Sequence, residues 1–134
     1  MSIAGLDRQE LAAIFLGGCV GGLLRAALAQ SLAQRPDQWP WATFLVNIVG
    51  ALLLGYVIAR LHERLPVSLY RRPFLGSGLC GALSTFSTMM VEVLRMIDGR
   101  HWALAVAYTT ASILCGLAAV FLSAKLVRRA RVWA

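Results

Sequence analysis

Charged residues are scarce in this sequence, and acidic ones are the scarcest. Only 14% of the 134 residues are charged, six of them Asp or Glu, whereas soluble domains average about 25%. No acidic side chain falls near the middle of a long apolar run, which argues against proton-coupled transport. Away from the ends of these runs, the polar groups are neutral hydrogen-bond donors and one arginine, Arg25.

Groups that enzymes use for chemistry are also few. His62 and His101 lie at the ends of apolar runs, and no Ser-His-Asp set, metal cluster or phosphate-binding loop appears. Cys19, Cys80 and Cys115 fall inside apolar runs without paired spacing, so we interpret them as small buried residues and not as disulfides or metal ligands. The sequence therefore predicts that the protein is not an enzyme.

Long apolar runs dominate what is present, since 59% of the residues are hydrophobic. Each run is long enough to cross a hydrocarbon core about 30 Å thick as a helix. The four runs are residues 11–30, 42–61, 74–97 and 103–127. They predict an all-α membrane protein with four transmembrane helices, forming a single domain over residues 1–134.

The net charge of +7 does not indicate a nucleic-acid partner, because the basic residues adjoin the ends of the apolar runs. With four crossings, the side that holds both termini carries nine of them: Arg8, Arg60, Arg64, Arg71, Arg72, Lys125, Arg128, Arg129 and Arg131. The other side carries Arg35, Arg95 and Arg100. This bias predicts that both termini are cytoplasmic.

The third apolar run has an unusual centre, GSGLCGALSTFST, at residues 76–88. Its glycines allow backbones to approach closely, and four hydroxyls crowd the end of the stretch: Ser84, Thr85, Ser87 and Thr88. Such a segment is expected to break near Gly81–Ser84. Broken backbone is tolerated at membrane depth only where protein buries it or where it lines a wet cavity.

Isolated polar residues in the other runs have two interpretations. Asn47 is a lone amide among apolar residues, and it either joins two helices or lines a pore. Arg25 either extends to the membrane surface or attracts an anion.

Tyr108 and Ser112 are spaced by four and share one helix face. Because these groups are donors, a permeating anion is favoured over a cation.

The glycines of the first run and one acidic–basic pair in the third run each have a single interpretation. Gly17, Gly18, Gly21 and Gly22 form two overlapping small-xxx-small pairs in the first run and predict close helix packing. Glu92 and Arg95 lie three residues apart near the end of the third run, which predicts a local ion pair.

Taken together, the motifs resemble the Fluc (CrcB) family of fluoride channels over nearly the whole chain. The matching stretches are GGCVGGLLR at 17–25, WPWATFLVNIVGALLLG at 39–55 and GLCGALSTFST at 78–88. The resemblance implies a passive fluoride channel in the bacterial inner membrane that lowers fluoride toxicity. It also implies an antiparallel, dual-topology homodimer, with a central Na⁺ held by the backbone carbonyls of Gly81 and Ser84.

The same resemblance implies which side chains contact fluoride, the other partners being a second copy and the lipid bilayer. The expected pore residues are Arg25, Asn47, Phe86, Ser87, Thr88, Met89, Tyr108 and Ser112. Met89 stands where the family has a second phenylalanine, and the basic bias of nine to three is unfavourable for insertion in both orientations. The alternatives are a small multidrug-type antiporter, which needs a membrane-embedded glutamate in the first helix, and a non-transporting scaffold.

Overall fold

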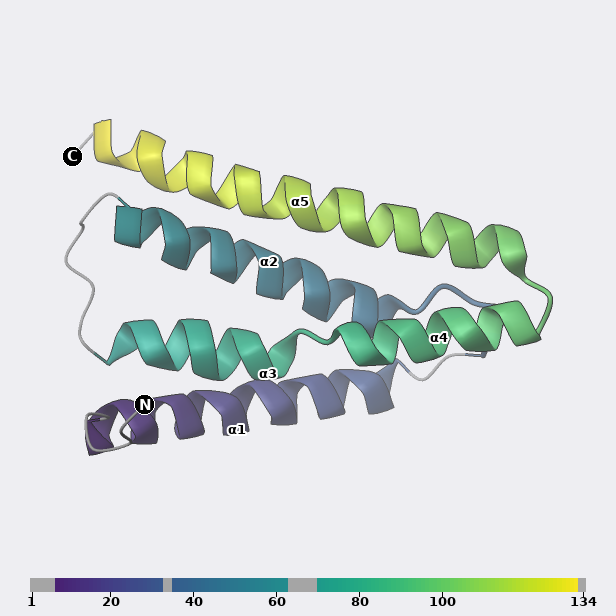
Figure 1. Cartoon of the computed structure of the whole chain (residues 1–134), viewed down its shortest axis with the longest axis horizontal. Helices are drawn as coiled ribbons and strands as arrows, with labels where there is room; N and C mark the ends of the chain where they lie inside the picture. The colour runs from purple at the N-terminus through teal and green to yellow at the C-terminus, as the bar shows by residue number, and fades with distance from the viewer. Residues whose placement is uncertain (1–6, 33–34, 63–69, 133–134) are drawn as a thin grey trace, which may run out of the picture.

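The computed structural model describes residues 7–32, 35–62 and 70–132 (Figure 1). Every regular element in these ranges is a helix. In chain order they are α1 (Arg8–Ser31), α2 (Trp41–His62), the π-helical η2 (Pro73–Cys80), α3 (Gly81–Leu83), α4 (Phe86–Asp98) and α5 (Trp102–Val132). Four spans are long and apolar enough to cross a membrane, η2 to α4 counting as one. The predicted all-α fold with four such helices is confirmed.

The spans run alternately up and down the bundle (Figure 1). The start of α1, the end of α2, the start of η2 and the end of α5 lie together at one end, which we call the terminal end. The α1–α2 connection and the α4–α5 turn lie at the other end, the hairpin end. α1 packs along η2 and α3, and α2 packs along α5.

Much of the apolar helix surface is exposed within one copy of the chain. In the most apolar stretch of α1 only 11% is buried, and in the corresponding stretch of α5 only 17%. Phe15, Leu23 and Phe121 are each about 70% exposed. Soluble monomers rarely expose so much contiguous apolar surface. Lipid tails are the solvent that such surfaces need, so the chain is a multi-pass membrane protein. In bacteria such a protein resides in the inner membrane.

Glycines allow α1 to lie directly against η2. A Cβ atom at Gly17 would overlap the Phe74 carbonyl oxygen, and one at Gly78 would lie 2.6 Å from the Ile14 carbonyl oxygen. Gly21 meets the η2 backbone in the same way. By contrast, a Cβ at Gly18 or Gly22 would meet nothing within 4 Å. The predicted close packing is confirmed, with only alternate glycines of the motif carrying it.

Alanine substitution should therefore affect stability differently in the two pairs of glycines. We expect Gly17→Ala and Gly21→Ala to lower the free energy of unfolding by about 1–3 kcal/mol or more, because the obstructing atoms are backbone and cannot rotate away. Gly18→Ala and Gly22→Ala are the matched controls and should leave stability nearly unchanged. Thermal unfolding in detergent measures all four, and equal losses in both pairs would contradict the packing described above.

The third span is interrupted at Ser84 and Thr85, which are both extended, with φ −76°, ψ 149° and φ −150°, ψ 121°. α4 starts again at Phe86, where the Thr85 side chain caps it by accepting from the Thr88 N–H at 3.2 Å. The predicted break near Gly81–Ser84 is thus confirmed, but it comprises Ser84 and Thr85, while Gly81–Leu83 are helical. The π-helical winding of η2 before the break was not predicted.

A small hydrophobic core lies in the half of the bundle nearer the hairpin end. It consists of Met89 and Met96 from α4 and of Ala105 and Tyr108 from α5. Tyr108 is completely buried, and the Trp39 ring packs edge-on against it with centroids 5.4 Å apart. This core fixes the rotation of α4 and α5 about their axes, which decides where their polar side chains point.

Candidate functional site

Asn47 of α2 bridges the break in the third span. Its Nδ2 donates to the Thr85 carbonyl oxygen at 3.1 Å, and its Oδ1 accepts from the Thr85 N–H at 2.7 Å. In an unbroken helix that N–H would donate to the Gly81 carbonyl four residues earlier. The Asn47 amide therefore joins two helices and satisfies backbone that the break would leave unpaired. Whether it also lines a pore stays a prediction.

The Thr85 hydroxyl organises the polar cluster after the break. It lies 3.2 Å from the Ser87 Oγ and 3.1 Å from the Thr88 Oγ1, besides accepting from the Thr88 N–H. That N–H would otherwise donate to the Ser84 carbonyl. The helical donors for the Gly81 and Ser84 carbonyls are thus both diverted, one by Asn47 and one by Thr85. These are the two carbonyls that the family resemblance implies as Na⁺ ligands.

A cavity of about 200 Å³ lies beside the break, between α1, α2 and α4. Its polar lining consists of the Arg25 guanidinium and of hydroxyls from Thr43, Thr85 and Thr88. The remaining walls are apolar: Ala26, Ala29, Ala42 and Val46. No carboxylate is among the lining residues. Thr43 donates its hydroxyl hydrogen to Glu92, and Thr85 donates its own to Thr88. The Arg25 charge and the Thr88 hydroxyl are therefore the lining groups that suit a small anion.

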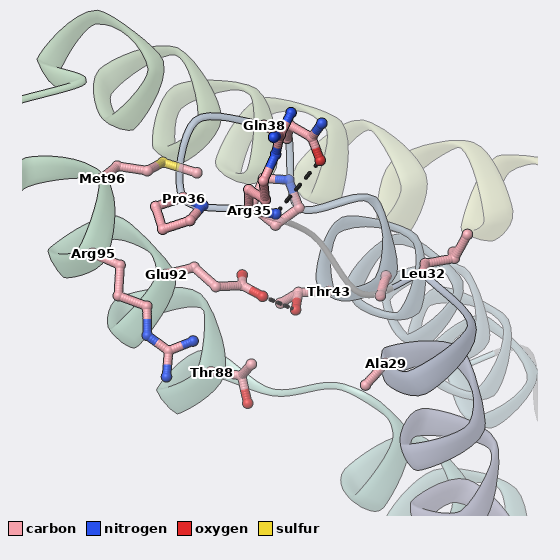
Figure 2. A pocket seen from close by; sticks show the side chains of 12 residues that line it. Ala29, Leu32, Arg35, Pro36, Gln38, Thr43, Thr88, Glu92, Arg95 and Met96 are labelled. Carbon is pink, nitrogen blue, oxygen red and sulfur yellow. Dashed lines mark hydrogen bonds between the residues drawn. The ribbon is translucent and has the colours of Figure 1, made fainter. Parts of the chain in front are cut away.

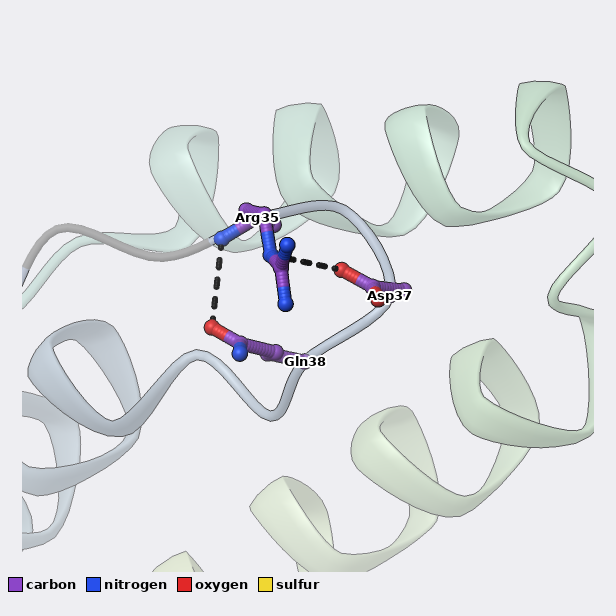
Figure 3. A network of polar contacts seen from close by, with 3 residues as sticks. All are labelled: Arg35, Asp37 and Gln38. Carbon is purple, nitrogen blue, oxygen red and sulfur yellow. Dashed lines mark hydrogen bonds and ion pairs between the residues drawn. The ribbon is translucent and has the colours of Figure 1, made fainter.

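A larger cavity of about 480 Å³ opens toward the hairpin end and shares Ala29, Ala42, Thr43 and Thr88 with the smaller one (Figure 2). Arg35 and Gln38 of the α1–α2 connection form part of its outer wall. There the Arg35 N–H donates to the Gln38 Oε1 at 3.5 Å, and the Arg35 Nε lies 3.6 Å from the Asp37 Oδ1 (Figure 3). The shared residues make the two cavities neighbours along one path toward the break.

Glu92 lines the larger cavity and is the site residue that the sequence interpretation missed. Its Oε1 accepts from the Thr43 Oγ1 at 2.5 Å, and its Oε2 accepts from the buried Tyr108 hydroxyl at 2.8 Å. The sequence placed Glu92 at the end of a span, whereas it lies inside α4 and links α2 to α5. Its partners are 49 and 16 residues away, so no local pattern indicates them.

The expected ion pair between Glu92 and Arg95 is wrong. Arg35–Asp37 is the one ion pair within the part of the chain that the structure describes. Figure 2 shows Glu92 reaching across the cavity to Thr43, while Arg95 extends along α4 toward Thr88. The Thr43 and Tyr108 hydroxyls bind both carboxylate oxygens, so partners on neighbouring helices take the place of Arg95.

The two positions of the expected aromatic contact have different environments. Phe86, the first residue of α4, is 71% exposed, whereas Met89 is 6% exposed and packs in the core beside Tyr108. The core therefore holds Met89, whereas the Phe86 ring is left exposed at the start of α4. The Ser112 hydroxyl on α5 is buried and has no hydrogen-bond partner among the described residues.

Substitutions at Glu92 test the network of three side chains. Glu92→Leu should lower the free energy of unfolding by about 1–3 kcal/mol, because the Tyr108 hydroxyl would lose its partner in a buried position. Glu92→Gln should be milder, since the amide can accept from one hydroxyl and donate to the other. Arg95→Leu is the control on the same helix and should have little effect. Stability is measured by thermal unfolding. An equal loss of stability in Arg95→Leu and Glu92→Leu would contradict the hydroxyl network and support the ion pair instead.

Comparison with known proteins places this architecture in a family. Residues 12–124 match the model of the family described as CrcB-like protein, Camphor Resistance (CrcB). Over 126 residues, which cover 94% of this chain and 96% of each relative, the chain is 60% identical to the fluoride-specific ion channel FluC 1 of Mycolicibacterium paratuberculosis and 58% identical to that of Mycobacterium bovis. The fluoride-specific ion channel FluC of Bacteroides fragilis is 37% identical, with 84% of this chain and 91% of the relative covered. The chain therefore belongs to the CrcB family.

Proposed function

We propose that this chain is a fluoride-selective channel that lets cytoplasmic fluoride leave the cell passively and so lowers its toxicity. The observation that carries the proposal is the cavity at the break, which is lined by Arg25 and three threonines and by no acidic residue. The relatives' names describe fluoride-specific ion channels and no enzyme. A channel moves its ion down the gradient and needs no coupled reaction.

The proposed path starts in the larger cavity and reaches the break. In the smaller cavity beside the break, Arg25 attracts the anion. The hydroxyls of Ser87 and Thr88 then replace part of the hydration shell of the anion. Asn47 has a second amide hydrogen beyond the one that it gives to Thr85, and this hydrogen is available to the ion. On α5, Tyr108 donates to Glu92, whereas the Ser112 hydroxyl, which has no partner among the described residues, offers the ion a further donor.

Phe86 supplies a different kind of contact. An aromatic ring has a positive edge, and ring-edge hydrogens suit a small hard anion. Because the ring is 71% exposed and is not held in the protomer core, it is free to face an ion path formed with a second copy. Met89 contributes by packing behind Tyr108, where its flexible side chain fills the space of the family's phenylalanine.

The proposed assembly is an antiparallel, dual-topology homodimer. The exposed Phe86 and an exposed Gly81, at which a Cβ would meet nothing within 4 Å, both lie beside the break and support a second chain covering this region. Antiparallel pairing would place the two basic terminal ends on opposite membrane faces and so separate like charges.

A structural Na⁺ at the centre of this dimer follows from the same break. The Gly81 and Ser84 carbonyls fit a hard cation, since their helical donors are diverted to Asn47 and Thr85. Each protomer offers two such oxygens, so the site is complete only with a second copy. The oxygen ligands indicate a hard cation, and the family resemblance supplies sodium.

Fluoride efflux from liposomes tests the proposed function. Purified protein should release fluoride when an ionophore dissipates the membrane potential, while chloride-loaded liposomes release almost none. Chloride efflux at a similar rate would show an unselective anion channel. Protein that is folded by size-exclusion chromatography yet releases neither ion would instead support the scaffold interpretation.

A further inference from the structure

The C-terminal part of α5 extends beyond the span. The helix has 31 residues and is about 46 Å long, against a hydrocarbon core of about 30 Å. Its apolar part ends at Ala124, after which Lys125, Arg128 and Arg129 are all exposed. If Lys125 lies at the membrane surface, Phe121 lies about 6 Å deeper, among the lipid tails.

These cationic residues share one helix face with an aromatic ring. Phe121, Lys125, Arg128 and Arg129 have the spacing of four, seven and eight residues that aligns side chains along a helix. They line a cavity of about 510 Å³ at the terminal end, distant in the fold from the two cavities beside the break. The Phe121 ring is 71% exposed. The face is therefore apolar on the side of the membrane interior and cationic toward the C-terminal end of α5.

No described acidic residue forms an ion pair with the cations of this face. The sequence has no acidic residue after Asp98, and none of the three cations forms an ion pair within the described ranges. The Arg128 Nε donates to the Ala124 carbonyl at 3.4 Å, which leaves its terminal nitrogens free to bind a ligand.

We propose that this face of α5 binds an anionic phospholipid of the leaflet that borders the terminal end of each protomer. The phosphate lies between Lys125 and Arg129, Arg128 contacts the outer part of the headgroup, and an acyl chain lies along the Phe121 ring. Juxtamembrane basic clusters attract anionic lipids in this way. The contiguous apolar ring favours a lipid over a soluble phosphate, which would gain nothing from it. This inference does not depend on which ion the protein conducts.

Native mass spectrometry can test the site on the purified protein. The protein is titrated with phosphatidylglycerol, and phosphatidylcholine serves as the zwitterionic lipid. We expect the triple variant Lys125→Gln/Arg128→Gln/Arg129→Gln to bind phosphatidylglycerol about a hundredfold more weakly, because each basic side chain near an anionic surface contributes about fivefold. Phosphatidylcholine binding should not change.

The matched control removes the same charge from the same end of the bundle. Arg8, Arg71 and Arg72 are exposed there, and Arg8→Gln/Arg71→Gln/Arg72→Gln should change phosphatidylglycerol binding by less than about threefold. An equal loss in both triple variants would overturn the proposal in favour of diffuse electrostatics. Size-exclusion chromatography and ion efflux check that both variants fold.

Two further arms distinguish a lipid from a soluble anion. Phe121→Ser should weaken phosphatidylglycerol binding about tenfold, since the acyl chain would lose its apolar contact, while inorganic phosphate at millimolar concentration should not displace the lipid. Displacement by inorganic phosphate, or an unchanged affinity in Phe121→Ser, would overturn the lipid assignment and leave a soluble-phosphate site.

Discussion

Fluoride efflux is expected to fall to the background of protein-free liposomes when Asn47 is replaced by leucine. The substitution removes both hydrogen bonds to the Thr85 backbone and the amide hydrogen proposed for the ion. An unsatisfied buried backbone group costs about 1–3 kcal/mol. The Thr85 N–H can avoid that cost by returning to the Gly81 carbonyl, which would close the break. The proposed ion path and the proposed Na⁺ ligands would then be lost together.

A control of the same kind is the hydrogen bond between α2 and α5. The Ser123 hydroxyl donates to the Leu52 carbonyl at 2.7 Å and joins α5 to α2 far from the break. Ser123→Ala removes an interhelical hydrogen bond without touching Thr85, so its efflux should stay close to that of the unsubstituted protein. Both variants should elute at the unsubstituted volume in size-exclusion chromatography. Near-normal efflux from folded Asn47→Leu protein would show that Asn47 is only an interhelical contact.

Phe86→Ile should reduce fluoride efflux severely, by about a hundredfold, and leave the fold intact. A ring edge aligned with a passing anion contributes through charge stabilisation, and one well-placed contact of about 2.7 kcal/mol corresponds to that factor. Stability should change little, because Phe86 is 71% exposed and leaves no cavity in the protomer. Stopped efflux with an unchanged melting temperature is therefore the expected pair of results.

Met89→Phe is the companion substitution, because it restores the family pattern. From the sequence alone it is expected to preserve or raise fluoride efflux. The structure adds a stability cost of about 1–3 kcal/mol, since a larger ring must enter the core beside Tyr108 and Met96. Efflux per folded protein is thus the quantity to compare. Unchanged efflux in Phe86→Ile, or none in folded Met89→Phe, would rule out the aromatic-edge contact.

The sequence by itself determined the class of protein and the place where the backbone is special. Apolar runs, their lengths and the crowding of glycines and hydroxyls at 76–88 are local properties of the chain. A hydrocarbon solvent and the cost of unpaired backbone translate them directly into four spans and a break. The motifs GGCVGGLLR and GLCGALSTFST added the family, which the 60% identity over 126 residues confirms.

Only the tertiary structure decided which side chains meet. Asn47 and Thr85 are 38 residues apart, and Glu92 meets Thr43 across 49. Such pairs depend on how far each helix is rotated about its axis, and a packed core sets that angle. The rotation of α4 buries Met89, exposes Phe86 and brings Glu92 to Thr43 and Tyr108. A spacing of three residues shows that two side chains are able to meet on one helix, but the competing partners on the neighbouring helices decide whether they do.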